Sequence, residues 1–362
     1  MREILKTYPI GIDMDDRCVT AAQYRKTRHG ISLRELACQP LTSSASEDDG
    51  ELVAALKSVR SSGSFKGRRV VVNIPFQDLS VFPVQFLLGE RDDPEEAILR
   101  EAVKFLPYPL EEAILDYPSF TNQAGTCTAT VVAVHRQVMT RWLGIMKSAG
   151  LTAEVMEFSF SSLLRLHRGL FPNDGRAELL CHIGRTRSLL AVANGEELLC
   201  FSETPWGIEP LSNKIRTQLE LPNAAAEAAT LLKDYGLAYS ERAALTKNTP
   251  DGSSQDSLDM YRVIFQIIAP TVDEFMNECH RTIGYLLSLQ DQAVFGKIYL
   301  YGLSDRISHL DRYLEKQTGI PTESVDALEN LGYAKENSPS CFPEGISSVL
   351  ALGLAMREVS WP

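Results

Sequence analysis

The sequence PIGIDMDDRCVTAAQY at residues 9–24 is the stretch that decides the expected fold. Its first five residues form a short apolar strand that ends at Asp13, and Cys18–Tyr24 form a returning strand. A turn between two such strands can hold a phosphate when glycine and a small hydroxyl let backbone N–H groups approach the anion. Asp15 and Asp16 occupy those positions here. The segment therefore predicts a phosphate loop whose phosphate chemistry has been lost.

The same layout occurs again in the second half of the chain. Residues 178–184 form a second apolar strand, residues 185–187 form its loop, and residues 188–192 return as a strand. Asn194-Gly195 then gives a strong signal for a two-residue hairpin turn. Residues 28–30 make the corresponding turn in the first copy. Two lobes that each open with strand, loop and strand imply a duplicated α/β architecture with a cleft between the halves.

A segment with a different character lies between the two copies. Asp93-Pro94 starts a helix, since acids in the first turn interact favourably with the helix dipole, and Pro107 ends it. Strands at 116–120 and 126–135 and a helix at 136–149 follow, and together they predict a small α+β subdomain. After the second copy we expect helices and one strand, at 223–235, 263–289, 297–301, 307–318 and 346–356.

The composition indicates a globular protein with room for two ordinary domains. The 362 residues are 44% hydrophobic and 23% charged, and the net charge of −11 argues against nucleic acid or an anionic membrane as the main partner. That charge still permits a local basic patch. No stretch approaches the roughly 18 apolar residues of a membrane span, and residues 1–6 lack the apolar core of a signal peptide. Seven scattered cysteines without a Cys-x-x-Cys pair predict buried thiols in a reducing cytoplasm and no metal site.

Several short segments carry a resemblance to a known family. The most specific is EAVKFLPYPLEE at residues 101–112, followed by Asp116-Tyr117. With these segments the chain resembles type IV pilus assembly proteins of the PilM family, in the superfamily of actin and the cell-division protein FtsA, over nearly its whole length. Further matching segments are VVAV at 131–134, AGL at 149–151, PWG at 205–207, KDYG at 233–236 and ALGLAMR at 351–357.

The resemblance implies an α/β fold of the actin-like (ribonuclease H-like) type. In this fold two related domains are duplicated around a cleft, and a small α+β subdomain of the FtsA type is inserted into the first. The expected boundaries are 1–85 with 150–173 for the first actin-like domain, 86–149 for the inserted subdomain, 174–213 with 295–362 for the second actin-like domain, and 214–294 for a helical subdomain.

The resemblance also places the nucleotide motifs of the family, and most of them are altered here. Asp13 matches the acidic residue that would help to organise hydrated magnesium, whereas Asp15 and Asp16 replace a glycine and a small hydroxyl. Two carboxylates about 5 Å from a phosphate would repel it by roughly 3 kcal/mol per charge pair at an effective dielectric of about 20. The resemblance thus implies a degenerate nucleotide cleft with no catalytic residue, no metal, and doubtful binding of ATP and magnesium. The other motif positions are Gly184, Thr186, Gly302 and His182, which replaces an acid.

Simpler interpretations of the same residues stay open. Asp15 and Asp16 are compatible with a plain turn, because aspartate tolerates strained turn geometry. His182 is compatible with a hydrogen-bonded cleft histidine that binds no ligand. Arg185 and Arg187 are either exposed or face the two aspartates across the cleft, where ion pairs would replace the nucleotide.

By resemblance, the chain is a scaffold or adaptor on the cytoplasmic side of the inner membrane and does not span the membrane itself. Members of this kind bind the short N-terminal tail of a bitopic inner-membrane pilus or secretion protein. The tail docks in an apolar groove between the first domain and the inserted subdomain, where backbone bonds add affinity. The pilus assembly ATPase is a further candidate partner, and nucleic acid is not expected. The candidate groove residues are Val81, Phe82, Val84, Phe86, Val103 and Tyr108.

Three other functions compete with this one. The actin-like scaffold of a type II secretion system shares the fold, but it normally continues into a transmembrane helix, whereas this chain ends at Pro362. An actin-like ATPase or a sugar-kinase-like phosphotransferase would need an in-line base and an intact phosphate cradle, for which Asp13 alone is insufficient. A filament-forming cytoskeletal protein is compatible with the scaffold, and polymerisation assays would separate it from a monomeric adaptor.

Overall fold

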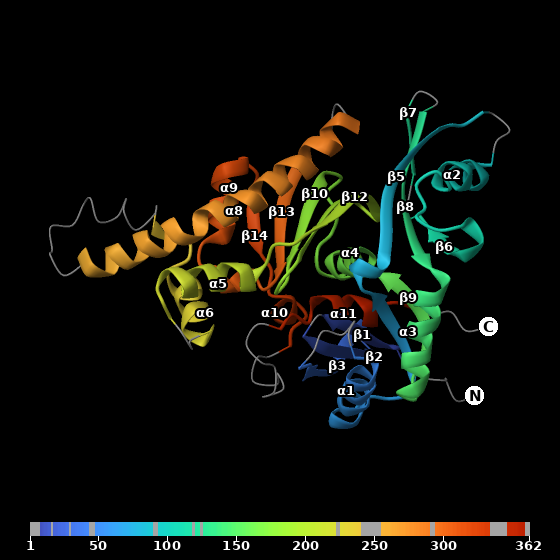
Figure 1. Cartoon of the computed structure of the whole chain (residues 1–362), viewed down its shortest axis with the longest axis horizontal. Helices are drawn as coiled ribbons and strands as arrows, with labels where there is room; N and C mark the ends of the chain where they lie inside the picture. Colours follow the sequence, from blue (N-terminus) through green and yellow to red (C-terminus); the bar gives the residue numbers. More distant parts are fainter. Residues whose placement is uncertain are drawn as a thin grey trace.

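The computed structural model of the chain contains two lobes and a smaller subdomain (Figure 1). No helix in the described part of the chain has both the length and the apolarity needed to cross a membrane. The structure describes residues 8–15, 17–28, 30–42, 48–89, 93–117, 120–123, 126–221, 225–239, 255–289, 294–333 and 346–358.

The first lobe is built on a five-stranded sheet in the order β3-β2-β1-β4-β9. The first three strands are antiparallel neighbours, while β4 lies parallel to both β1 and β9. Asp13 faces Thr20 in the β1–β2 register, so both predicted strands of residues 9–24 are present. The strands are β1 (Ile10–Asp15), β2 (Cys18–Thr27), β3 (Gly30–Pro40), β4 (Arg69–Ile74) and β9 (Thr152–Phe158).

The second lobe repeats this arrangement strand for strand. Its sheet has the order β12-β11-β10-β13-β14, with the first three strands antiparallel and the last two parallel to their neighbours. The predicted duplicated two-lobe α/β fold is therefore confirmed. The strands are β10 (Ala177–Ile183), β11 (Ser188–Asn194), β12 (Glu197–Thr204), β13 (Phe295–Gly302) and β14 (Thr322–Ser324).

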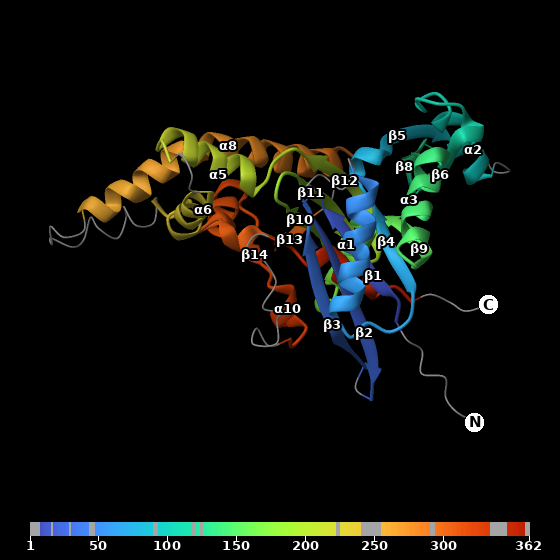
Figure 2. The ribbon, with the colours of Figure 1, turned by 60° about the horizontal axis from the view of Figure 1, so that its bottom comes forward.

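Helices cover the outer face of each sheet and fill the space between the sheets (Figures 1 and 2). On the first lobe the outer helices are α1 (Asp49–Ser62) and α3 (Arg136–Ser148). Between the sheets lie α4 (Ser159–Leu170) and α11 (Val349–Ala355). On the second lobe the outer helices are α5 (Ile208–Gln218), α6 (Ala225–Asp234), α8 (Gln255–Leu289) and α9 (Leu310–Thr318). Short helices are η1 (Phe76–Asp78), η2 (Leu110–Glu112), η4 (Ser304–Arg306) and α10 (Ala327–Asn330).

The two central helices pack unusually closely, and glycine makes this possible. A Cβ atom at Gly353 of α11 would lie 2.0 Å from the carbonyl oxygen of Ser162 on α4. A Cβ atom at Gly11 of β1 would lie 2.3 Å from the backbone nitrogen of Ala355. Every residue of α11 from Val349 to Ala355 is buried. The helix is therefore held between β1 and α4 with no room for a larger side chain at either contact.

The inserted subdomain carries a four-stranded sheet in which β8 is central. It pairs with β5 along one side and with β6 and β7 along the other. Helix α2 (Pro94–Ala102) covers one face of this sheet and shares an apolar core with it. The strands are β5 (Leu79–Leu87), β6 (Ala113–Asp116), β7 (Phe120–Gln123) and β8 (Thr126–His135).

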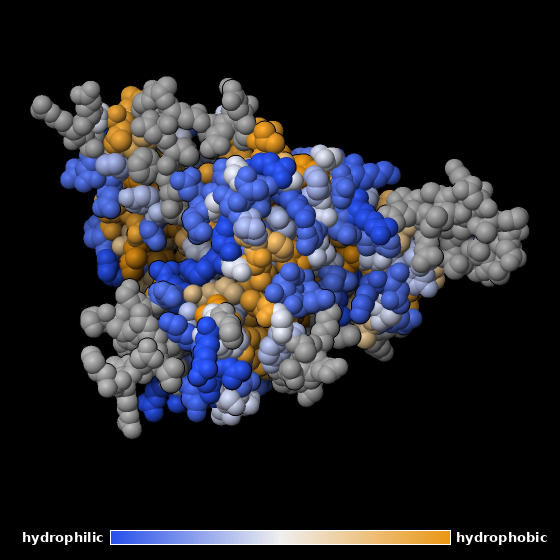
Figure 3. All heavy atoms as spheres, turned by 180° about the vertical axis from the view of Figure 1, so that it is seen from behind, coloured by the Kyte–Doolittle hydropathy of each residue, from blue (hydrophilic) through white to orange (hydrophobic). Residues whose placement is uncertain are grey.

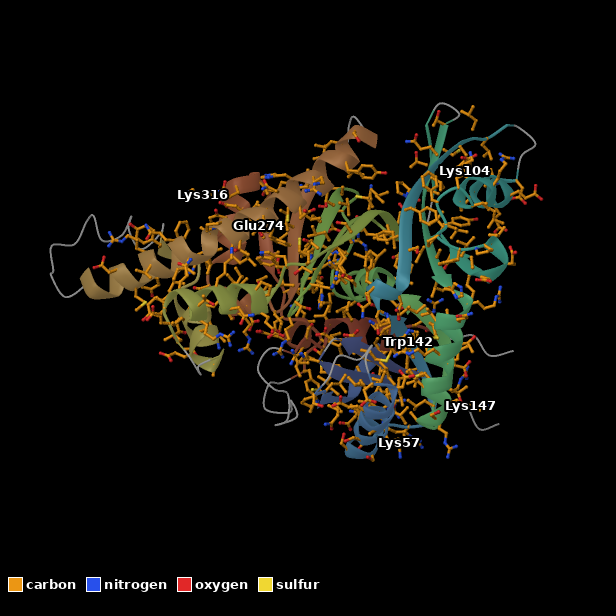
Figure 4. All side chains as sticks on the ribbon, in the orientation of Figure 1. Lys57, Lys104, Trp142, Lys147, Glu274 and Lys316 are labelled. Atoms are coloured by element: carbon orange, nitrogen blue, oxygen red, sulfur yellow. The ribbon has the colours of Figure 1, made fainter. Side chains whose placement is uncertain are left out.

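The limits of this subdomain differ from the predicted range of 86–149. Its sheet already begins at Leu79, because all of β5 pairs with β8. Helix α3 packs on the first lobe instead, where Trp142 is fully buried in the core beneath the sheet (Figure 4). The Trp142 indole Nε1 donates a hydrogen bond to Oδ2 of Asp78, at 2.7 Å. The reason is topological: α3 is the crossover helix between the parallel neighbours β4 and β9, and such a helix must lie on their sheet.

Replacing Gly353 with alanine should destabilise the protein by about 1–3 kcal/mol, because the added methyl group would collide with the Ser162 carbonyl on α4. The matched control is Gly144→Ala on α3, where a Cβ atom meets nothing within 4 Å. That change should stabilise the protein by about 0.5–1 kcal/mol, since alanine is the better helix former. Urea unfolding of both variants measures the two effects. Equal free energies for the two variants would contradict the close packing of α4 and α11.

Candidate functional site

A pocket between the lobes brings together most of the predicted nucleotide positions. It is formed where β1 and β10 end, and its volume is about 90 Å³. The predicted residues that line it are Asp13, Asp15, His182, Gly184 and Thr186, and further lining residues include Asn73, Arg185, Arg187, Glu203, Leu303 and Ser347. Asp16 lies outside the described residues.

Asp13 is buried at the base of this pocket. Its Oδ1 accepts a hydrogen bond from Nδ2 of Asn73 at 2.7 Å, and Asn73 Oδ1 accepts one from the backbone N–H of Met14 at 3.1 Å. Burial, together with the nearby charge of Asp15, raises the pKa of Asp13 to about 8. Near neutral pH the buried Asp13 carboxyl therefore favours its protonated form.

His182 lies opposite Asp13, on the strand from the second lobe. Its Nε2 is 3.0 Å from Oγ of Ser347, which lies two residues before the central helix α11. Burial lowers the pKa of His182 to about 4, so the ring is neutral. Gly302 does not line the pocket but packs beneath this ring. It has a φ of 76°, and a Cβ atom there would lie 3.0 Å from the imidazole and 2.3 Å from the Ile183 carbonyl oxygen. His182 thus connects the second lobe to α11, as in the simpler interpretation of this residue.

The second loop folds tightly on itself. A Cβ atom at Gly184 would lie 2.2 Å from the carbonyl oxygen of Arg187. Nε of Arg185 donates a hydrogen bond to Glu209 at 3.0 Å, and Arg187 forms an ion pair with Glu203. Both arginines therefore have carboxylate partners within the second lobe. These pairs differ from the hypothesised pairs with the aspartates of the first loop.

The six predicted groove residues occupy three different environments. Val84 and Phe86 are 1% and 5% exposed, in the core between β5 and α2. Val81 is half-buried against the core between the lobes. The ring of Phe82 stacks on that of Phe105, with 5.6 Å between the ring centroids. The ring of Tyr108 packs edge-on against His135, with 4.8 Å between the centroids. Val103 is 48% exposed.

The prediction is therefore corrected for Val84 and Phe86. Side chains alternate along a strand, and α2 covers the face of β5 to which the even-numbered residues belong. These two side chains would reach a partner only if α2 left the sheet. Phe105, which is 54% exposed, and Leu87, which is 74% exposed, provide apolar surface that the sequence prediction did not include.

Comparison with known proteins agrees with this architecture. The model of the family "Type IV pilus assembly protein PilM" matches residues 11–245. The chain belongs to the PilM family. A solved "PilM-PilN type IV pilus biogenesis complex" superposes with a TM-score of 0.71 at 19% identity, and the match covers 96% of this chain and 97% of the other. The ethanolamine utilization protein EutJ from Carboxydothermus hydrogenoformans superposes with a TM-score of 0.51 at 12% identity, over 96% of this chain and 89% of the other. The two-domain actin-like fold is thus established.

The cleft of this PilM-family chain fits a magnesium-bound triphosphate poorly. Asp15 and Glu203 add carboxyl groups to the pocket beside Asp13, and both arginines already have glutamate partners. The Met14 N–H of the first loop is already bonded to Asn73. The volume of about 90 Å³ is also well below the roughly 300–1,000 Å³ of pockets that hold drug-sized ligands. These features count against tight binding of ATP.

Two polar networks around buried carboxylates were missed in the sequence prediction. In the first, the Glu157 carboxylate of β9 accepts hydrogen bonds from both terminal nitrogens of Arg165, at 2.7 and 2.9 Å. It also forms an ion pair with Arg357. Arg165 also donates to the carbonyl oxygen of Gly353, at 2.9 Å. This network fastens α4 to the C-terminal helix α11.

The second network fastens α4 to the sheet of the second lobe. His167 is completely buried, with Nδ1 2.6 Å from the Tyr301 hydroxyl and Nε2 3.2 Å from Glu178. Glu178 also pairs with Arg168 at 2.6 Å. Burial lowers the pKa of His167, so a neutral ring donates to Glu178 and accepts from Tyr301. No sequence motif announces such contacts, because their members are far apart in the chain.

The protonation of Asp13 predicts a pH-dependent difference between the protein and its Asp13→Asn variant. The folded-state pKa of about 8 lies above the ordinary aspartate value of 3.8, so the stability that Asp13 contributes is complete below pH 4 and is lost as the pH rises through 8. Asparagine keeps the hydrogen bond from Asn73 but does not ionise. The stability of the variant relative to the parent should therefore grow between pH 5 and 8, by at most about 1.4 kcal/mol per pH unit. Thermal unfolding across this range tests it, and a difference that stays constant with pH would contradict the raised pKa.

Proposed function

We propose that this PilM-family protein is a cytoplasmic scaffold of a type IV pilus assembly platform at the inner membrane. In this role it holds the cytoplasmic N-terminal tail of a bitopic membrane protein, and it does so without hydrolysing ATP. The solved relative is a complex of PilM with PilN, which makes a PilN-type protein the proposed partner. The observation that carries the proposal is an open strand edge on the inserted subdomain, next to exposed apolar side chains.

The open edge belongs to β5. This strand is the last in its sheet, and no described strand pairs with its outer side. Pro83 lies in the middle of β5. Proline has no N–H and is tolerated in sheets where its nitrogen faces away from the neighbouring strand. The backbone N–H and C=O groups of an antiparallel strand alternate in direction from residue to residue. If the nitrogen of Pro83 faces away from β8, the backbone groups of Gln85 and Leu87 face away from β8 as well. An extended tail can add to this edge as a further strand.

Apolar side chains lie close to the same edge. Phe82 of β5 stacks on Phe105, which follows α2, and Val103, two residues before Phe105, is exposed. Leu87, at the end of β5, exposes a further apolar side chain on the opposite face of the strand. Viewed from behind, apolar side chains gather over the inserted subdomain, at the left (Figure 3). Backbone bonds along the edge would supply affinity, and these side chains would supply pockets for alternate residues of the tail.

The tail-binding proposal predicts that Val103→Asp weakens binding of a synthetic peptide with the sequence of the N-terminal cytoplasmic segment of the PilN-type partner. A charge among apolar contacts should raise the Kd at least about tenfold. The matched control is Val294→Asp, because Val294 is also an exposed valine, at 64%, and precedes β13 in the second lobe. Isothermal titration of both variants measures the effect. An equal loss in both, or no loss at Val103, would remove this surface as the tail site.

A second change tests the strand edge itself. Gln85→Pro removes an outward N–H while leaving the bonds between β5 and β8 in place. The peptide affinity should fall, whereas Gln85→Ala should bind as the parent does. Unchanged affinity in the proline variant would show that the tail does not pair with β5.

The competing candidate is an actin-like ATPase, which is favoured by the meeting of Asp13, Gly184 and Thr186 in one interlobe pocket. Isothermal titration with ATP and magnesium separates the two. The carboxyl groups of the pocket and the paired arginines predict no heat and no thermal shift at about 1 mM nucleotide. A micromolar Kd would show that the altered loops still form a nucleotide site and would turn attention to Asp13 as a metal-organising residue.

A further inference from the structure

Two segments of the first lobe are strongly basic although the whole protein is acidic. Residues 24–34 and 64–69 contain no aspartate or glutamate, while the chain has a net charge of −11. Such a local excess of one sign creates an attractive potential for anions over that part of the surface. The basic residues of the two segments are Arg25, Lys26, Arg28, Arg34, Lys66, Arg68 and Arg69.

The fold brings these two segments to one end of the molecule. The Gln23 side chain donates to the carbonyl oxygen of Lys66 and accepts from its N–H, both at 2.8 Å. Nε of Arg34 donates to the carbonyl oxygen of Ser64 at 3.1 Å. The loop between α1 and β4 is therefore fixed against the β2–β3 hairpin. We call the joined segments the basic end.

The hairpin of the basic end projects beyond the rest of its sheet. Strand β1 pairs with β2 only as far as Gln23, whereas β2 and β3 stay paired to their turn at Thr27 and Gly30. In Figure 2 the hairpin reaches below α1 and β4, and the inserted subdomain lies at the opposite side of the lobe. Figure 1 likewise separates these two regions. The basic end is thus distinct from the proposed tail site.

The cations of the basic end are available to an external partner. Arg25, Lys26, Arg28, Lys66 and Arg68 are exposed. Among the described residues none of these five forms an ion pair with a carboxylate, in contrast to Arg69, which pairs with Glu154. The nearby Glu35 carboxylate accepts from the backbone N–H of Ser64.

An exposed apolar side chain lies among these cations. Ile31 faces Lys26 in the β2–β3 register and is 41% exposed. An apolar residue surrounded by lysine and arginine suits the boundary between lipid headgroups and acyl chains. Surfaces that bind single-stranded nucleic acid instead combine cations with exposed aromatic rings. Of the aromatic residues described in the basic end, Tyr24 is 1% exposed and Phe65 packs against the core of the first lobe.

We propose that the basic end binds anionic phospholipid headgroups, with Ile31 at the hairpin tip entering the headgroup layer. The cations attract a negatively charged leaflet over a Debye length, and binding should therefore weaken as salt is added. This contact requires no protein partner. It goes beyond the proposed tail binding and can fail independently of it.

Vesicle co-sedimentation tests the proposal with the full-length protein. The probes are vesicles of phosphatidylcholine alone and of phosphatidylcholine with about one third phosphatidylglycerol, at about 50 and 500 mM salt. We expect binding to the anionic vesicles at low salt and little binding in the other three conditions. The triple change R25E/K26E/R28E should reduce the bound fraction at least about tenfold. Ile31→Asp should reduce it further than Ile31→Ala does.

The matched control reverses the same number of exposed lysines in the second lobe, with K214E/K233E/K316E (Figure 4 labels Lys316 on α9). The control and the test variant have the same net charge, but the control leaves the basic end unchanged. The control should therefore bind anionic vesicles better than the test variant does. Equal losses would assign binding to overall charge and overturn the proposal. Binding to RNA or polyglutamate without binding to vesicles would also overturn it.

Two further measurements keep the outcome decisive. If the triple variant does not fold by circular dichroism, K66E/R68E in the neighbouring loop replaces it, and the same loss is expected. The folded variants should bind the tail peptide as the parent does. Retained vesicle binding in these variants would overturn the proposal, whereas loss of vesicle binding with retained peptide binding would support the separation of the two surfaces.

Discussion

The contact between α4 and α11 is the constraint on which the rest of this structure depends. Both helices lie between the two sheets. Because residue 353 of α11 is glycine, the α11 backbone can contact the backbone of α4 at Ser162. Residues of both sheets, among them Tyr24 and Tyr301, join the helices in one apolar core. The lobes are therefore joined by close packing. The pocket, both buried polar networks and the position of His182 follow from this packing.

The polar groups of the cleft bind one another where a nucleotide would otherwise satisfy them. Asp13 is bonded to Asn73, His182 is close to Ser347, and Arg187 pairs with Glu203. Glu157 and Glu178 are buried carboxylates with arginine partners. Removing one member of a pair buried on both sides, as Glu178 and Arg168 are, typically costs about 3–5 kcal/mol, because the other charge stays buried. Opening the lobes would break the contacts of Glu178 with His167 and Arg168, because these join α4 to the sheet of the second lobe.

The sequence predicted those features that depend on local patterns. Turn chemistry and strand alternation located both strand–loop–strand copies, and the duplication then implied that Asp13 and His182 meet in one cleft. The sequence did not predict the burial of Phe86, because the position of α2 decides which face of β5 is covered. The partner of Arg185 is likewise set by the start of α5, which lies far along the chain. Pairs of this kind arise from tertiary packing and have no local signature.

The placement of α3 has a consequence for how this protein can evolve. In the second lobe, β13 is connected to its parallel neighbour β14 through α9, and in the first lobe α3 holds the equivalent place between β4 and β9. The inserted sheet with α2 is thus an elaboration of one loop in a crossover that is complete without it. Loop insertions add little to the entropic cost of folding, since this cost grows only logarithmically with loop length. Recognition of a new partner can therefore be acquired, exchanged or lost in this loop while the duplicated platform beneath it is inherited unchanged.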